Sequence, residues 1–525
     1  AEAEAKRLKE QRIKIEALKK ELAEQKITYG KEEAERLKTE AKANREVEIQ
    51  HNLELKKIEA EASKTKDWSD FLTCSEIPDP VNTADLNSFV LVQREEVPEN
   101  SRDIEHIIKT CAQSQRMIKE TERQISKLLE EGNQGPDYKN LLGIIKELRL
   151  HSLYLLNSYT LNTLRTIDTL LDKKRIFQMN HGAHGVRFAM WVRYPDDKAG
   201  DDGVGDIEMD KIGITLSRVP ATLQIEGESA GLQIMHVDYD MLSSQSDTLG
   251  PYTTIGGVFY IRRLHLPGEA IHTRGYIRRN RKTETQKLTF LRYPNDGVDT
   301  PIGDLHVSLK LPENLFITET QPMIGWWNSE KMAWCSDGHR EKDTKYDAKT
   351  HHLHIKIWRL EPFAVLQPRA LDFPYLDWNL MKQTEGKESG VVLTLKGSRF
   401  EVKIIATSQG VSLLSPAVPG YEGVMSPGHL LLRLKKSGLN LVPTDDDAKF
   451  CHKPLKSKTL EEKSCNDLAH VVGVLDISGC RYSSSQEADV ALVKIRESCY
   501  VLPEPEPEAE PEKVDPNAKP DPEVV

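Results

Sequence analysis

The stretch Arg187-Phe188-Ala189-Met190-Trp191-Val192-Arg193-Tyr194 decides how most of this chain folds. It is rich in aromatic and apolar residues and follows a period of two, which is the period of a β-strand and not of a helix. Many similar runs follow it, separated by turns that contain Pro, Gly and Asp. The predicted strands are residues 186–194, 211–216, 221–226, 256–265, 287–292, 304–310, 315–319, 353–358, 363–367, 391–396, 399–406, 411–414, 470–477 and 489–496.

Strands at this spacing, without helical patterns between most of them, favour antiparallel β-sandwiches over a parallel sheet. We expect two sandwich-like modules, at 181–372 and 373–500, with one short helix near 427–437 in the second. A chain of 525 residues has room for about three domain-sized units. Because the residues before 181 have helical patterns, the predicted fold class is α+β with several domains.

Residues 67–180 are predicted to form a helical hairpin. Their apolar residues recur at three- and four-residue spacing over 83–92, 101–131 and 137–179, as on the buried side of an amphipathic helix. The loop Gly132–Pro136 supplies both a helix stop and a helix start. Packing the two longer helices against each other is the simplest way to bury their apolar sides.

Residues 1–66 are predicted to form one long charged helix or coiled coil. They contain 17 Lys and Arg and 15 Glu, no Pro and a single Gly, so that most residues are strong helix formers. A thin apolar stripe with a seven-residue period predicts pairing with a partner helix or a surface groove. The seam residues are Leu8, Ile15, Leu18, Leu22 and Tyr29. The alternative is a solvated single helix without a fixed partner.

Charge and composition disfavour several classes of protein. The chain has 72 Lys and Arg against 82 Asp and Glu, and its net charge of −10 argues against a general nucleic-acid binder. No run approaches the about 18 consecutive apolar residues of a membrane span, so we expect no membrane partner.

Seven Cys without a Cys-x-x-Cys pair indicate a reducing compartment. Residues 501–525, rich in Pro and Glu, are expected to be a disordered tail.

The sequence contains none of the familiar catalytic patterns, such as a phosphate-binding loop, a serine nucleophile elbow or His-Glu-x-x-His. Ordinary surface histidines explain one His-rich stretch better than a zinc site does, although zinc is the alternative. The residues concerned are Cys335, His339, His351, His352 and His354. Cys451 and Cys465 lie in polar, Lys-rich sequence, and Asp445–Asp447 lacks the rest of an EF-hand loop. We therefore expect no catalytic residue, metal or cofactor.

Basic residues gather in two places. The sharpest cluster consists of Arg278, Arg279, Arg281 and Lys282. The other is a row in the N-terminal helix, formed by Lys6, Arg7, Lys9, Arg12, Lys14, Lys19 and Lys20. Both are candidate contacts with an acidic polymer surface, and the alternative for each is a solvated face.

Three tryptophans, Trp326, Trp327 and Trp334, bracket a short polar turn. The pattern predicts two paired strands with large side chains packed across them. A cluster that faces a partner protein is the alternative.

Several motifs, taken in their order and spacing, resemble the axonemal dynein intermediate chain 7 family, also called the cancer susceptibility candidate 1 family. The resemblance covers about residues 67–497, and a Lys/Glu-rich helix ahead of it is also a feature of the family. The motifs are Trp68-x-x-Phe71-Leu72-x-Cys74 with Pro78-Asp79-Pro80, Thr253–Tyr260, Trp327-Asn328 through Trp334 to Asp337-Gly338, Phe363-x-x-Leu366-Gln367, Leu434–Thr444 and Val493–Glu497.

The resemblance implies a non-catalytic intermediate-chain-type subunit of an inner-arm dynein complex, located in the axoneme of motile cilia or flagella. Its implied partners are axonemal dynein heavy and intermediate chains, tubulin of the doublet microtubule and other axonemal proteins. The two basic groups then become the candidate tubulin contacts. Two alternatives stay open: a dynein-independent structural or microtubule-associated protein of the axoneme, and an enzyme with an unfamiliar site.

Overall fold

The structure is a computed structural model, and its residues form helices and antiparallel sheets, which confirms the α+β part of the predicted fold class. It describes residues 2–73, 77–183, 185–195, 206–217, 229–246, 250–278, 287–293, 305–319, 321–338, 340–383, 390–444, 447, 449–451, 455–480, 482–483 and 486–497. Among the described helices, none combines the length and the hydropathy that a membrane-spanning segment needs.

Four helices open the chain: α1 (Glu2–Thr73), α2 (Thr83–Glu96), α3 (Ile104–Glu130) and α4 (Pro136–Leu164). Side chains fix three of the starts, because Asn82 and Asp103 accept from backbone N–H groups of α2 and α3, and Pro136 is the first residue of α4. A core cluster joins α2, α3 and α4 through buried residues such as Leu86 and Met117. This local packing explains why their apolar stripes were readable in the sequence.

An eight-stranded antiparallel sheet follows, in the order β1-β2-β5-β6-β15-β11-β12, with β9 paired to β6. Its strands are β1 (Ile176–Ala183), β2 (Val186–Arg193), β5 (Ala230–Val237), β6 (Tyr252–Leu264), β9 (Phe290–Leu291), β11 (Ile324–Asn328), β12 (Ala333–Cys335) and β15 (Phe363–Pro368). A five-stranded sheet has the order β13-β14-β10-β4-β3. It contains β3 (Ile207–Met209), β4 (Ile214–Ser217), β10 (Leu305–Lys310), β13 (Thr344–Asp347) and β14 (His352–Ile357).

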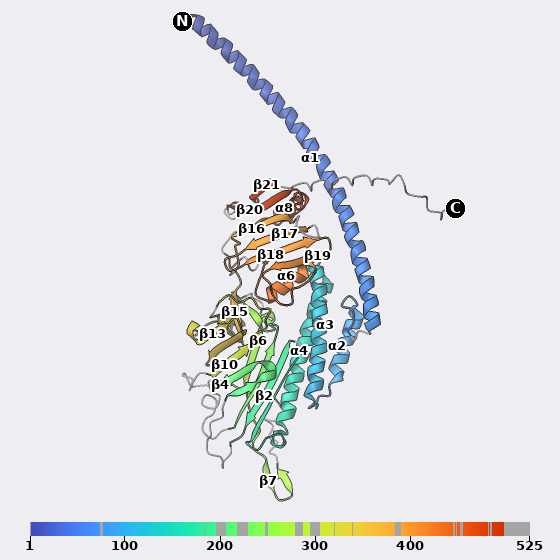
Figure 1. The fold of residues 1–525 in the computed structure, drawn as a ribbon, viewed down its shortest axis with the longest axis vertical. Coiled ribbons are helices and arrows are strands. Elements are labelled where there is room, and N and C mark those ends of the chain that lie inside the picture. Colours follow the sequence, from blue (N-terminus) through green and yellow to red (C-terminus); the bar gives the residue numbers. More distant parts are fainter. Residues whose placement is uncertain are drawn as a thin grey trace, which may run out of the picture. The chain divides into compact units, whose positions relative to one another are not determined.

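Strand β2 has a core on each of its faces, which is why its sequence is decisive. Phe188 and Met190 belong to a cluster that contains Leu156 and Tyr159 of α4. Trp191, on the other face, belongs to a cluster that contains residues of the five-stranded sheet. The eight-stranded sheet therefore lies between a helical layer and a second sheet (Figure 1). A strand covered on both faces has little room for polar residues, as its sequence shows.

A two-residue bulge in β6 explains one of the family-like motifs. Ile255 pairs with Val365 and Phe259 with Phe363. An advance of four residues along β6 therefore matches an advance of only two residues along β15. Gly256 and Gly257 fill the difference, both with positive φ. A Cβ at Gly257 would lie 2.0 Å from the carbonyl oxygen of Val237, so only glycine fits there.

The chain divides into two compact units. Unit 1 comprises residues 1–372, 418–420 and 425–451, and unit 2 comprises 373–417, 421–424 and the residues from 452 onward. Unit 1 includes α6 (Pro427–Lys436), which confirms the short helix predicted near 427–437. The division of the sequence into five domains stays a prediction.

Unit 2 contains a six-stranded antiparallel sheet in the order β19-β18-β17-β16-β20-β21. Its elements are β16 (Asp377–Gln383), β17 (Gly390–Lys396), β18 (Glu401–Thr407), β19 (Gly410–Ser415), α8 (Lys458–Val471), β20 (Leu475–Gly479) and β21 (Val493–Glu497). One apolar row crosses all six strands in register, formed by Leu413, Ile404, Leu393, Leu380, Ile477 and Ile495.

Some of the predicted elements were wrong. The helix predicted over 137–179 ends at Leu164, and β1 begins at Ile176. Between them Asp172 accepts from the backbone N–H groups of Lys174 and Ile176, and Arg175 has φ 59°, a turn geometry that a helix cannot continue through. Residues 315–319 are not a strand, and most of 470–477 is helix end and turn rather than strand. The strand predicted at 221–226 lies outside the described residues.

Candidate interaction surfaces

Helix α1 presents almost all of its described side chains to solvent. Tyr29 of the predicted seam is 69% exposed, and Lys19 and Lys20 are also exposed. The remaining predicted residues of α1 lie in the helix, but their side chains are not described: Lys6, Arg7, Leu8, Lys9, Arg12, Lys14, Ile15, Leu18 and Leu22. Their roles in pairing or in binding stay predictions.

The C-terminal end of α1 carries three large exposed apolar side chains. Trp68, Phe71 and Leu72 are 63%, 73% and 63% exposed, respectively. Their i, i+3, i+4 spacing places them on one side of the helix. The rings of Trp68 and Phe71 stack, with centroids 5.8 Å apart. This is the pattern with which helices anchor in a partner's groove.

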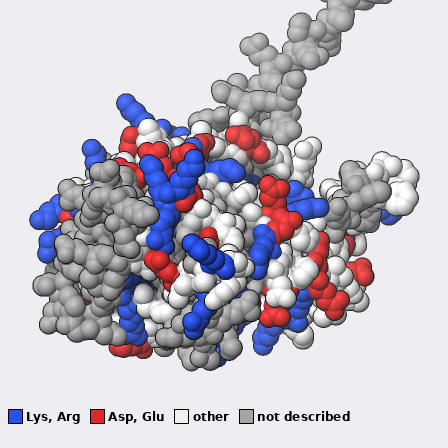
Figure 2. Space-filling view, turned by 90° about the horizontal axis from the view of Figure 1, so that it is seen from below, with Lys and Arg blue, Asp and Glu red and all other residues white. Residues whose placement is uncertain are grey.

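A two-stranded ribbon, β7 (Ile271–Thr273) and β8 (Tyr276–Arg278), carries the first residue of the basic cluster. Arg278 is exposed and pairs across the ribbon with Ile271, which is 60% exposed. Tyr276 is 63% exposed. The rest of the cluster, Arg279, Arg281 and Lys282, lies outside the described residues. The face drawn in Figure 2 shows Lys and Arg interspersed with Asp and Glu.

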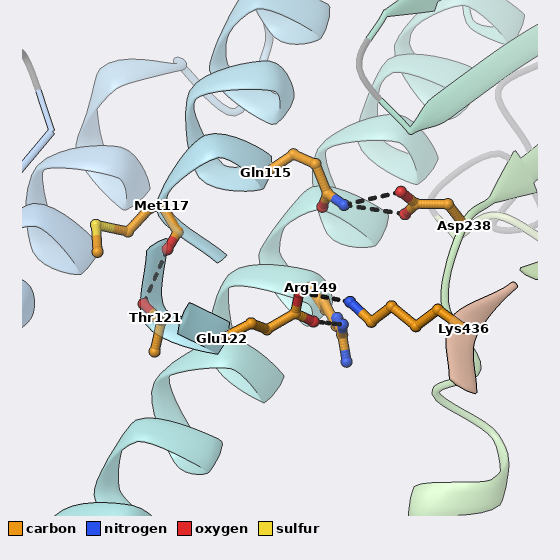
Figure 3. Close-up of polar contacts among 7 residues, drawn as sticks. All are labelled: Gln115, Met117, Thr121, Glu122, Arg149, Asp238 and Lys436. Atoms are coloured by element: carbon orange, nitrogen blue, oxygen red, sulfur yellow. Dashed lines mark hydrogen bonds and ion pairs between the residues drawn. The ribbon is translucent and has the colours of Figure 1, made fainter. Parts of the chain in front are cut away.

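An ion-pair cluster, which we call the α6 clasp, attaches α6 to α3 (Figure 3). The Glu122 carboxylate of α3 accepts from Lys436 Nζ of α6 and, at 3.1 Å, from Arg149 Nη2 of α4. The Glu122 side chain is 14% exposed and that of Arg149 17%. At the other end of α6, the backbone N–H of Gly428 donates to Glu130 Oε1 at 2.5 Å. Two consecutive helices, α3 and α4, and the distant helix α6 therefore meet at one carboxylate.

A second polar contact in Figure 3 joins α3 to the end of β5. Gln115 Nε2 donates to Oδ1 and Oδ2 of Asp238, at 2.9 and 3.2 Å. Burial raises the pKa of Asp238, while Lys436, Lys119 and Arg149 act in the opposite direction. The hydrogen bonds hold a helix and a strand together. The partner of the carboxylate is a side-chain amide, which takes part in no acid–base chemistry.

Other buried titratable groups in unit 1 are held in unreactive forms. Burial lowers the pKa of His236 to about 3, and its Nε2 lies 2.8 Å from the carbonyl oxygen of Gly256. The imidazole also stacks on Phe259 with centroids 4.2 Å apart. Burial raises the pKa of Cys111 to about 12, which suppresses the thiolate. These groups fit packing roles rather than acid–base or nucleophilic roles.

The histidine-rich stretch is accounted for by local contacts. His351 Nδ1 lies 3.2 Å from the Tyr346 hydroxyl, and His352 Nδ1 lies 2.9 Å from the carbonyl oxygen of Thr350. His352 and His354 stack with centroids 6.4 Å apart. Within the described part of the chain, no three His, Cys, Asp or Glu residues are placed to hold a metal ion. His339 lies outside that part.

The remaining candidate loop also has a structural use. Asp447 is 1% exposed and accepts from the backbone N–H and the hydroxyl of Thr444, and Arg369 Nη1 lies 3.5 Å from its Oδ1. These hydrogen bonds and the nearby cations lower the pKa of Asp447 against the effect of burial. Burial and Asp447 together raise the pKa of the neighbouring Cys451 thiol. Asp445 and Asp446 lie outside the described residues, and Cys465 is exposed on α8.

Trp327 of β11 and Trp334 of β12 pack into the core, which confirms the favoured interpretation of the sequence pattern for these two residues. Trp327 and Trp334 face each other across the two strands, with ring centroids 5.5 Å apart at 71°. They are 6% and 5% exposed, and Trp326 is 7% exposed. The indole of Trp334 donates to Asp240 Oδ2 at 2.8 Å.

None of the α6 clasp residues was singled out from the sequence. Glu122 and Lys436 are 314 positions apart, so no local pattern relates them. The one available signal was Glu122 itself, a charge that lies close to the apolar stripe of α3 and so needs a partner.

The fold and these surfaces define an α+β protein built from a long exposed helix, a helical layer and antiparallel sheets, whose notable features are contact surfaces. Residues 1–196 match the family model described as cancer susceptibility candidate 1 N-terminus. The family resemblance seen in the sequence is thereby confirmed.

Curated relatives carry the name dynein axonemal intermediate chain 7. The bovine protein (Bos taurus) is 23% identical over 256 residues, which cover 47% of this chain and 35% of that protein. The zebrafish protein (Danio rerio) is 22% identical over 276 residues, or 49% of this chain and 36% of the relative. The human protein is 23% identical over 257 residues, or 47% and 35%. The chain thus spans about a third of the length of the relatives it matches.

Proposed function

We propose that this protein is a non-catalytic, intermediate-chain-type subunit of an axonemal dynein complex, with the inner arm as its place. The observation that supports this most is the match of about half of the chain to proteins named dynein axonemal intermediate chain 7. The exposed apolar end of α1 and the projecting ribbon of unit 1 are surfaces that a scaffold subunit would use. In this proposal, residues 67–180 act as a helical hairpin and the sheets as sandwich-like modules that present these surfaces.

The proposed partners are axonemal dynein heavy and intermediate chains, the tubulin doublet and other axonemal proteins. The test is mass spectrometry of the proteins that co-purify with the tagged chain from detergent-stripped axonemes after high-salt extraction. Recovery of inner-arm heavy and intermediate chains would support the subunit role. Retention of the protein on salt-stripped doublets, or release without dynein chains, would favour the alternative, a structural protein of the doublet that acts independently of dynein.

We also propose that the basic cluster contacts the acidic surface of tubulin through Arg278 and the residues that follow it. Changing Arg278, Arg279, Arg281 and Lys282 to Glu should weaken co-sedimentation with microtubules, and most strongly at low salt, where exposed charges are least screened. The control is a charge reversal of Lys494 and Arg496, two exposed residues of β21. Equal binding of the cluster variant and the wild type at low salt would remove this surface from the proposal.

A further inference from the structure

A pocket with two tryptophan walls opens where the eight-stranded and five-stranded sheets face each other. Its floor is apolar, because Ile324, Ile355 and Phe363 are each at most 4% exposed. Trp326 of β11 and Trp358, the residue after β14, stand at 74° to each other with ring centroids 5.6 Å apart. With Arg359 in place, the free volume of the pocket is small, about 20 Å³.

A cation of this chain lies in the corner that the two indole rings form. The Cζ atom of Arg359 lies 3.7 Å from the ring centroid of Trp358 and 4.4 Å from that of Trp326. Its Nη1 reaches Glu361 Oε2 only at 3.4 Å, and its buried Nε has no hydrogen-bond partner among the described residues. The guanidinium is therefore held mainly by the faces of two rings, which attract a positive charge without fixing its hydrogen bonds.

The side chain of Arg359 can leave without disturbing the loop that carries it. The next residue, Leu360, donates its backbone N–H to the carbonyl oxygen of Tyr293 at 3.2 Å. Two residues further on, Pro362 accepts from the backbone N–H of Trp327 at 2.9 Å. The Arg359 side chain itself is 25% exposed. Its backbone is fixed, and its side chain has a path to solvent.

We propose that Trp326 and Trp358 form a cage for the guanidinium of an arginine of a partner protein, and that Arg359 occupies the cage until that group replaces it. The bound guanidinium of Arg359 shows which chemistry the two rings accept. This inference does not rest on the proposed dynein role.

The charges at the rim are compatible with such an exchange. Asp343 and Glu361 line the pocket together with Arg340 and Lys356, so two negative side chains face two positive ones once Arg359 has left. The entering cation meets no net repulsion from these four groups, and the two carboxylates can contact it.

The test uses the full-length chain and three small probes: N-acetyl-arginine amide, N-acetyl-trimethyllysine amide and the neutral N-acetyl-citrulline amide. Binding is followed by isothermal titration calorimetry and by tryptophan fluorescence. Arg359→Ala should bind the arginine probe at least tenfold more tightly than the wild type does, and should not bind citrulline measurably. Tighter binding of the trimethyllysine probe than of the arginine probe would contradict an arginine as the partner group.

A matched control is Arg262→Ala, because Arg262 also lies over two rings, at 4.5 Å from Tyr260 and 4.9 Å from Phe290, but lines no part of this pocket. It should bind the probes as the wild type does. A folded Arg359→Ala protein that binds neither cation, or binds citrulline equally well, would overturn the proposal.

A second measurement covers the case in which Arg359→Ala does not fold. In wild-type protein, millimolar N-acetyl-arginine amide should shift the indole N–H resonances of Trp326 and Trp358, with the Trp358 signal assigned through Trp358→Phe. The fully buried Trp191 should not shift. Unchanged signals from the two pocket tryptophans would count against the cage.

Discussion

At the scale of single residues, His236 links the packing of β5 to pH. Its folded-state pKa of about 3 lies far below the usual value of 6.5, because burial disfavours the imidazolium. The folded protein therefore keeps His236 neutral while the unfolded chain binds a proton below pH 6.5. The stability that this residue contributes is present above that pH and is lost as the pH falls toward 3.

We expect His236→Gln to weaken this pH dependence. Between pH 7 and pH 5, the free energy of unfolding of the wild type should fall by about 2 kcal/mol more than that of the variant, at about 1.4 kcal/mol for each pH unit below 6.5. Urea titrations at the two pH values measure the difference. The control is His354→Gln, at an exposed position of β14. Parallel curves for wild type and His236→Gln would contradict the assignment.

Which residues could be found from the sequence depended on how local their contacts are. The tryptophan pair of β11 and β12 was predictable, because Trp327 and Trp334 are joined by a short turn and must face each other. The Trp326–Trp358–Arg359 pocket was not, because its residues meet only when two sheets stack. The basic cluster around Arg278 was found as a charge pattern, and such a pattern does not say what the charge contacts.

At the scale of elements, α6 depends on its clasp. Glu122→Gln keeps the size of the side chain and removes the charge that Arg149 and Lys436 share. The free energy of unfolding should fall by about 1–3 kcal/mol, since the nearly buried Arg149 loses its ionic partner, while Lys436 is half exposed and regains water. Urea unfolding measures the loss.

The same helix offers a matched control. Glu120 pairs with Arg123 on α3, but their side chains are 28% and 56% exposed. Glu120→Gln should therefore cost less than about 1 kcal/mol, as exposed pairs generally do. Equal losses for the two variants would mean that Glu122 contributes no more than an ordinary surface charge.

Helices were easier to predict than strands because a helix is decided by neighbours in sequence. The boundaries of α3 and α6 follow from capping residues and apolar spacing that are visible in the chain. Strand β5, by contrast, reads Ala-Gly-Leu-Gln-Ile-Met-His-Val and was missed, because Gly, Gln and His interrupt its apolar pattern. All eight of its residues are buried, so the surrounding layers and not its own sequence make it a central strand.

At the scale of the whole molecule, α1 is separable from the rest of unit 1 in stability. Its described side chains are nearly all exposed, so removing residues 1–66 should change the Tm of the remaining chain by less than about 1 °C, equivalent to under about 1 kcal/mol for a protein of this size. The circular dichroism signal should lose the helix of the removed segment. A fall of several degrees would show that α1 packs on the body of the protein.

The larger architecture could be predicted only in part, because some of its contacts join residues that are far apart in the sequence. The change from helical to strand patterns near residue 180 identified the α+β class. The sequence did not predict that α6 belongs to unit 1. Most strands of the unit 2 sheet lie between α6 and the rest of unit 1 in the sequence. The sequence places α6 in the predicted second module, and contacts made across more than 300 positions place it in the first unit.

The return of the chain to unit 1 at α6 has a consequence for synthesis on the ribosome. Glu122 emerges early, but Lys436 follows 314 residues later, after strands β16 to β19 of unit 2 have already been made. At about 5–20 residues per second, the nascent chain waits on the order of 15–60 s with the α6-binding side of α3 uncovered. During that interval the side of α3 that α6 covers stays open to solvent, and chaperones that bind exposed segments of nascent chains have their opportunity before translation ends.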